Sequence, residues 1–68
     1  MSDRGARFTV REREIVLLVR QGLRNRKIAT QLGLTEGTVK TGLHRIFRKA
    51  GIATRTALAI RAAEWLID

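Results

Sequence analysis

The apolar positions of the chain recur at helical spacing in four segments that short polar or glycine-containing joints separate. Near the N-terminus, Phe8, Ile15 and Val19 share one helical face at about 100° per residue, whereas Leu17 falls on the opposite side and is expected to be exposed. The longest segment carries a second apolar stripe, formed by Val39, Leu43, Ile46, Phe47 and Ala50. The pattern predicts an all-α fold of four helices, at about residues 10–21, 25–32, 36–50 and 55–66.

The predicted helix ends carry residues that commonly begin or terminate helices. Thr9 and Glu12 have the spacing of a capping box, in which each side chain accepts a hydrogen bond from the backbone amide of the other residue. Thr35 is placed to cap the third helix, and Gly51 to end it in a left-handed conformation. The boundaries therefore follow from local sequence as well as from periodicity.

Length and composition restrict the organisation and the chemistry of the chain. Its 68 residues allow one domain, assigned to residues 8–68, after a small, polar and charged segment at residues 1–7 that is expected to form a flexible N-terminal arm. Fourteen Lys and Arg against six Asp and Glu give a net charge of +8, which favours a polyanionic partner. With no Cys and one His, neither an enzyme nor a bound cofactor or metal is expected.

No apolar run approaches the roughly 20 residues of a membrane span, and the N-terminus lacks the apolar core of a signal peptide. The sequence therefore predicts no membrane partner and a cytoplasmic, nucleoid-associated location.

The segment from Lys27 to Phe47 has the arrangement of a helix-turn-helix. Ala29 is small where a second helix must approach, and Gly33 supplies a backbone turn before the long amphipathic helix. Opposite its apolar stripe this helix has a basic ridge, comprising Gly37, Lys40, Thr41, His44, Arg45 and Arg48, with Thr38 at its edge. Such a helix fits the major groove of DNA, where Lys, Arg and Thr side chains can bond base edges. A merely solvated charged face is the alternative, which the near absence of acid beyond Glu36 disfavours.

Further runs of sequence are FTVREREI at 8–15, GLRNRKIA at 22–29, LGLTEGTVK at 32–40, IFRKAGI at 46–52, and Arg55-Thr56. With these runs the chain resembles the DNA-binding domain of LuxR-type (GerE, or NarL/FixJ) bacterial transcription regulators over about residues 8–66. The resemblance implies a four-helix helix-turn-helix domain, a third helix that enters the major groove, and homodimers on inverted half-sites, often through the fourth helix. It also implies roles for the ridge: base reading by Lys40, Thr41 and His44, phosphate binding by Thr38, and backbone contact or secondary reading by Arg45, Arg48 and Lys49.

The start of the second helix departs from the family pattern. Where the family commonly has Ser and Glu as a capping box, this chain has Arg24 and Lys27, with Arg26 between them. Each cation at a helix N-terminus is disfavoured by the helix dipole by about 0.3–1 kcal/mol, and an anion would relieve this. In a helix-turn-helix the first helix crosses the DNA backbone. We therefore expect phosphate contacts without sequence preference here, from Arg24, Asn25, Arg26 and Lys27.

A second departure lies within the third helix, where Gly42 replaces the family's usual His. The missing side chain is expected to remove a phosphate contact. Gly42 and Gly37 each cost a helix about 1 kcal/mol relative to Ala, so the first turns of this helix are expected to be loosely ordered without DNA.

The fourth helix is apolar on more than one side. Leu58, Ala59, Ala62 and Leu66 can face the core, with Trp65 on another side, while Ile60, Ala63 and Ile67 form a further stripe that predicts a homodimer interface. An alternative is a protein-interaction adaptor or antiactivator that docks RNA polymerase or another regulatory protein through this helix, and a frayed C-terminus is a third possibility. The promoter-reading region of a small sigma factor is also similar, but a further helix after Gly51 suits LuxR-type domains better. The favoured function is sequence-specific binding of double-stranded DNA in bacterial transcription regulation.

Overall fold

The computed structural model describes residues 8–66. This part of the chain contains four helices and no strand: α1 (Val10–Arg20), α2 (Asn25–Leu32), α3 (Glu36–Ala50) and α4 (Arg55–Leu66). The predicted all-α, four-helix fold is confirmed. Three helices have the predicted bounds, while α1 ends one residue early because Gln21 is its C-terminal cap and the backbone turns at Gly22, where φ is 91°. The predicted arm at residues 1–7 lies outside the described residues.

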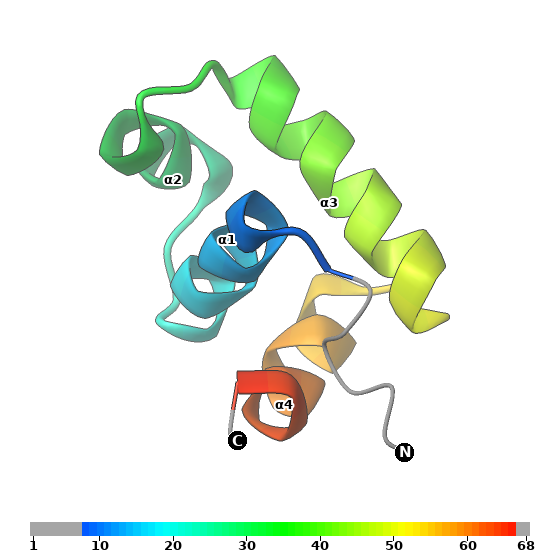
Figure 1. Ribbon diagram of the computed structural model, residues 1–68. Coiled ribbons are helices and arrows are strands. Elements are labelled where there is room, and N and C mark those ends of the chain that lie inside the picture. The colour runs from blue at the N-terminus through cyan, green and yellow to red at the C-terminus, as the bar shows by residue number, and fades with distance from the viewer. Residues whose placement is uncertain (1–7, 67–68) are drawn as a thin grey trace.

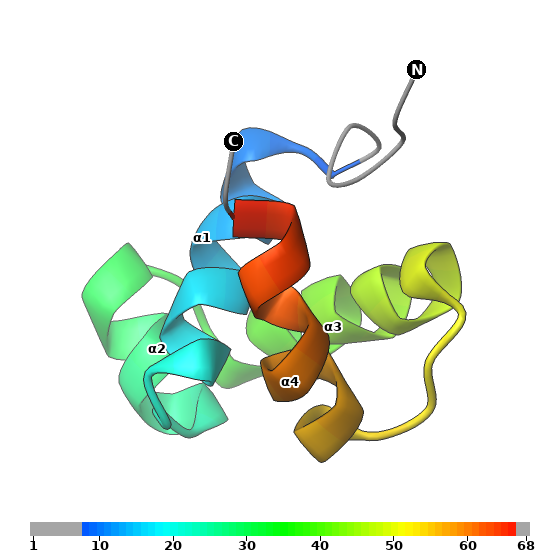
Figure 2. The same cartoon turned by 90° about the horizontal axis from the view of Figure 1, so that it is seen from below.

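The four helices pack around α1. Figure 1 shows α1 between the helix-turn-helix pair α2–α3 and the last helix, with α3 extending along one side of the molecule. In the view from below, α4 is nearest the viewer and crosses in front of α1 (Figure 2). The outer side of α3 is consequently left uncovered by the other helices.

The core consists of the apolar stripes that the sequence predicted. Its buried side chains come from all four helices: Ile15, Val16, Leu18, Val19, Ile28, Ala29, Val39, Leu43, Ile46, Leu58 and Ala62. Phe8 and Phe47 pack against this cluster from its edge. Leu17 is 40% exposed, as its position opposite the stripe predicted.

The helix ends are stabilised as the local sequence predicted. The Thr9 hydroxyl accepts from the Glu12 amide at 3.0 Å, and the Thr9 amide donates to Glu12 Oε1 at 2.9 Å, which completes the capping box. Thr35 caps α3 by accepting from the Thr38 amide at 3.1 Å. Gly51 ends α3 with φ of 68°, in the left-handed region that a side chain resists. Short-range hydrogen bonds thus define the start of α1 and the start of α3.

None of the described helices combines the length and the apolarity that a membrane span requires. Residues 8–66 also hold no group of three or more His, Asp or Glu side chains that could bind a metal ion.

Candidate nucleic-acid interface

The turn between α2 and α3 is built from residues that permit a close approach of the two helices. Gly33 adopts φ of 69°, and the Leu34 amide donates to the carbonyl of Ala29 at 2.8 Å, which closes the end of α2. Ala29 is only 4% exposed and leaves room for the neighbouring helix. Thr35 then starts α3 directly after the turn. The chain from Asn25 to Ala50 is therefore a helix-turn-helix unit whose second helix is the longer one.

The ridge predicted on the long helix lies on the uncovered side of α3. Lys40, Thr41 and His44, the predicted base readers, are all exposed, whereas the intervening Leu43 is buried. Exposure extends to the remaining predicted contacts on this helix: Thr38, Arg45, Arg48 and Lys49. One face of α3 thus carries hydrophobic residues into the core, and the opposite face presents polar and cationic side chains to solvent.

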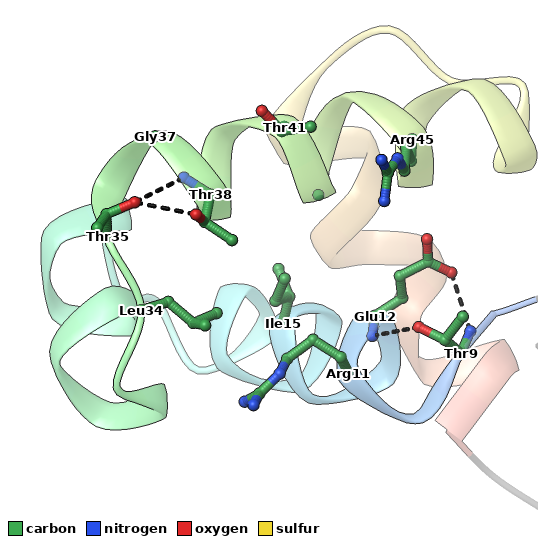
Figure 3. A pocket seen from close by; sticks show the side chains of 11 residues that line it. Thr9, Arg11, Glu12, Ile15, Leu34, Thr35, Gly37, Thr38, Thr41 and Arg45 are labelled. Atoms are coloured by element: carbon green, nitrogen blue, oxygen red, sulfur yellow. Dashed lines mark hydrogen bonds between the residues drawn. The ribbon is translucent and has the colours of Figure 1, made fainter.

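Thr38 is held in place by the residue that caps its helix. The Thr35 hydroxyl donates to the Thr38 hydroxyl at 3.0 Å while it accepts from the Thr38 amide (Figure 3). In that bond the Thr38 oxygen is the acceptor, so its own proton remains available to donate to an anion. The α3 N-terminus and an oriented hydroxyl therefore point to the same region of the surface, which suits a phosphate oxygen.

The α2–α3 surface has a strong excess of positive charge. From Arg20 to Lys49 the sequence contains eight Lys and Arg and a single acid, Glu36. Other described acids lie elsewhere and have cationic partners: Glu14 with Arg11 at 3.1 Å, and Glu64 with Arg61 at 3.8 Å. The acids therefore do not neutralise the surface that α2 and α3 present.

Lys49 has a structural partner that its sequence position did not reveal. Its Nζ lies 2.7 Å from Oε1 of Glu12, whose side chain is 7% exposed, so the pair joins the end of α3 to the start of α1. Burial raises the pKa of Glu12. Hydrogen bonds from Lys49 and from the Thr9 amide, together with the positive charges of Lys49 and Arg45, outweigh burial and hold the pKa below its ordinary value. A DNA contact by Lys49 would therefore compete with this ion pair.

The start of α2 has the excess of positive charge that the sequence predicted. Arg24 is the N-terminal cap, its side chain makes no capping hydrogen bond, and the first turn contains no acid. Arg24, Arg26 and Lys27 are all exposed. The first amides of the helix have no intrahelical acceptor, so this end combines free donors with cationic side chains.

Asn25, the fourth residue predicted at this end, differs from its neighbours because it is half-buried and bound. Its Oδ1 accepts from Nη1 of Arg55 at 2.7 Å, and Nη2 of the same guanidinium donates to the Leu23 carbonyl at 2.6 Å. The sequence pattern predicted no role for Arg55. The one available signal was its place in the Arg55-Thr56 pair that the chain shares with the LuxR-type pattern.

Gly42 lies in α3 opposite Ile15 of α1. A side chain there would begin 3.0 Å from Cδ1 of Ile15, which shows that the position faces α1 and not the outer side of α3. The expectation that Gly42 removes a phosphate contact stays a prediction. A groove of about 670 Å³ lies beside this position between α1 and α3, and its walls include Thr9, Thr41 and Arg45 (Figure 3).

The fourth helix has both a buried and an exposed apolar side. Leu58 and Ala62 are fully buried against the core, whereas Ile60 is 71% exposed. Ala63, which shares the predicted interface stripe, is half-buried. The third member of that stripe, Ile67, lies outside the described residues. Among the α4 side chains that the structure describes, Ile60 is therefore the large apolar one that is exposed to a partner.

A compact helix-turn-helix domain with a cationic outer face is the class of protein that these features define. Residues 6–62 match the family of bacterial regulatory proteins described as the luxR family, or GerE, so the chain belongs to that family. It is 48% identical over 59 residues to the monoamine regulon transcriptional regulator of Klebsiella aerogenes. The aligned residues cover 87% of this chain and 26% of that protein.

Two further relatives support the same placement. The nitrate/nitrite response regulator protein NarL of Escherichia coli K12 is 39% identical over 59 residues, covering 87% of this chain and 26% of its own length. The probable csgAB operon transcriptional regulatory protein of Salmonella typhimurium is 39% identical over 67 residues, covering 98% and 29%. The chain thus spans between a quarter and a third of these curated relatives. No solved structure gives a significant match.

Proposed function

We propose that the chain binds double-stranded DNA sequence-specifically and acts in bacterial transcription regulation, with α3 in the major groove. The observation that carries this proposal is the outer face of α3, where Lys40, Thr41 and His44 are exposed on a surface that contains one acid. A major groove about 12 Å wide admits a helix of this kind, and Lys and Thr side chains can bond base edges there. Membership of the luxR family supports the same function.

Phosphate contacts on both sides of α3 would set its register in the groove. On one side we assign them to Arg24, Arg26 and Lys27 at the start of α2, which has no side-chain cap to occupy its amides. On the other side Thr38 offers a hydroxyl proton, and Arg45 and Arg48 extend the cationic surface along α3. Such contacts carry affinity and its salt dependence but no sequence information.

The proposed active form is a homodimer through α4. Support comes from Ile60, which is 71% exposed and would gain burial against a second copy of α4. A two-fold axis at this helix would present two α3 helices to successive half-sites, about one DNA turn apart. The protein would then act on the cytoplasmic DNA of a bacterium.

A binding experiment with two variants tests the proposal. Selection from a random duplex library gives a preferred site, and titration at several salt concentrations gives affinities for that site and for a scrambled duplex. Lys27→Gln should weaken both to the same degree and lower the slope of log affinity against log salt by about 0.9. Lys40→Ala should cost the preferred site about 1–3 kcal/mol and the scrambled duplex much less.

Arg61→Gln on α4 is the matched control, since it removes one positive charge outside the α2–α3 surface. Its salt slope should equal that of the unmodified protein. Absence of salt-dependent duplex binding by the unmodified chain would overturn the proposal.

The second candidate function is a protein-interaction adaptor or antiactivator that docks RNA polymerase or another regulator through α4. The exposure of Ile60 favours it as much as it favours a homodimer. Binding experiments distinguish the two functions. An adaptor would show little affinity for duplex DNA, and its binding to a protein partner would depend on Ile60 but not on Lys40.

A further inference from the structure

Arg55, the first residue of α4, ties that helix to the start of α2. Its Nη1 donates to Oδ1 of Asn25 at 2.7 Å and its Nη2 donates to the carbonyl of Leu23 at 2.6 Å. Leu23 and Asn25 flank Arg24, the N-terminal cap of α2. One guanidinium therefore holds Asn25, the first residue of α2, across 30 positions of sequence and Leu23, which precedes the helix, across 32 positions.

The bond from Arg55 determines which way the Asn25 amide faces. A guanidinium has only donors, so the atom that it contacts must be the carbonyl oxygen of the amide. The Asn25 nitrogen, with its two protons, is then directed away from Arg55. Among the described residues this nitrogen has no hydrogen-bond partner. The side-chain nitrogen of Asn25 is thus an oriented hydrogen-bond donor without a partner among the described residues.

The surroundings of that donor suit an anion. Asn25 lines a shallow groove at the start of α2 together with Arg24, Arg26, Glu36 and Arg55, so that three guanidinium groups and one carboxylate border it. Arg24 and Arg55 border the same groove, and burial together with the neighbouring positive charge of Arg24 lowers the pKa of Arg55. An incoming phosphate would relieve this repulsion and would also meet the free amides of the first turn of α2.

We infer that Arg55 is a positioning residue for DNA binding: it holds the Asn25 amide and the start of α2 so that both donate to a backbone phosphate. The inference rests on the proposed function and adds to it a residue of α4 that does not itself touch DNA. It also links the helix proposed for dimerisation to a phosphate contact.

The geometry requires arginine. Two nitrogens of one planar group reach two separate acceptors, a side-chain amide and a backbone carbonyl. A lysine ammonium is a single point of charge on a flexible stem and does not reproduce this fork. Arg55→Lys therefore keeps the charge and the distant electrostatics while it releases Asn25.

A double-mutant cycle tests the inference. Affinity for one duplex is measured by fluorescence anisotropy for the unmodified protein, Arg55→Lys, Asn25→Ala and the double variant, with circular dichroism melts to establish that each is folded. Each single change should weaken binding about tenfold, and the double variant should be no weaker than Asn25→Ala alone. Additive losses would show that Arg55 contacts DNA by itself, and an unchanged affinity for Arg55→Lys would show no role; both results overturn the inference.

A second pair of variants keeps the test decisive if loss of the Arg55 link unfolds the domain. Asn25→Asp retains an acceptor for Arg55 but removes the N–H donor, so its melting temperature should be maintained while its affinity falls. Gln31→Glu, at an exposed position later in α2, adds the same negative charge and should reduce affinity much less. Equal losses for the two variants would contradict the inference. If the unmodified protein binds no duplex, the proposed function fails with it, whereas binding with an additive cycle refutes the role of Arg55 alone.

Discussion

At the scale of single residues, Glu12 joins two distant parts of the chain. Its Oε1 accepts from the Thr9 amide at 2.9 Å and from Lys49 Nζ at 2.7 Å, so one carboxylate both caps α1 and anchors the end of α3. The side chain is buried, and its charge is compensated by hydrogen bonds to charged and backbone donors. Glu12 therefore contributes to stability as an anion, and this contribution depends on pH.

Glu12→Gln should destabilise the domain by about 1–2 kcal/mol at pH 7, because it removes the charge that Lys49 partners. The folded pKa of Glu12 lies below its unfolded value. Its stabilisation is therefore complete above the unfolded pKa and is lost as the pH falls through the folded pKa. In thermal melts from pH 7 to pH 3, the melting temperature of Glu12→Gln should fall less with decreasing pH than that of the unmodified protein.

Glu14→Gln is the matched control for this prediction. Glu14 forms an exposed pair with Arg11, so its replacement should change stability by less than about 1 kcal/mol. Equal acid sensitivity of the unmodified protein and Glu12→Gln would show that other groups cause the loss.

At the scale of elements, α3 contains two glycines in different surroundings. A Cβ at Gly37 would meet only Thr35 Oγ1 at 3.8 Å, whereas a Cβ at Gly42 would lie 3.0 Å from Cδ1 of Ile15. Ile15 Cδ1 is the end of a flexible side chain beside the groove between α1 and α3, so it can shift. Both positions thus tolerate a methyl group, but position 42 requires a small adjustment.

Gly37→Ala should stabilise the isolated domain by about 1 kcal/mol, and Gly42→Ala by a smaller amount because Ile15 must move. Gly33→Ala is the control of opposite sign, since its φ of 69° disfavours any side chain. Chemical denaturation measures all three, and amide exchange in the unmodified protein should be faster from Gly37 to Leu43 than over the following turns of α3. A destabilised Gly42→Ala would indicate that Ile15 cannot yield.

At the scale of the whole molecule, the proposed homodimer depends on the exposed side of α4, where Ile60 is 71% exposed. Ile60→Glu should abolish self-association in sedimentation experiments with the preferred duplex, because a charge at this contact would lose hydration without a partner. Val10→Glu is the control, since Val10 is 76% exposed at the start of α1, where an acid is favourable. Association that survives Ile60→Glu unchanged would exclude this face of α4 as the interface.

Helix bounds, core stripes and the exposed ridge of α3 could be predicted from the sequence because each depends on residues close together along the chain. A capping box spans four residues, and a helical face repeats within two turns, so Thr9, Glu12, Val39 and Leu43 carried enough information by themselves. The excess of positive charge at the start of α2 was visible for the same reason.

Only the tertiary structure shows which of the predicted contact residues already have hydrogen-bond partners within the domain. Lys49 meets Glu12 across 37 positions, and Asn25 meets Arg55 across 30, and neither pair has a local sequence signal. The direction of position 42 likewise depends on where α1 lies beside α3. The helices, their buried faces and the charge of the surface follow from the sequence alone, because helical periodicity and residue charge are local properties. Packing decided how that surface is held, because the rotation and separation of the helices bring distant donors and acceptors within hydrogen-bonding distance.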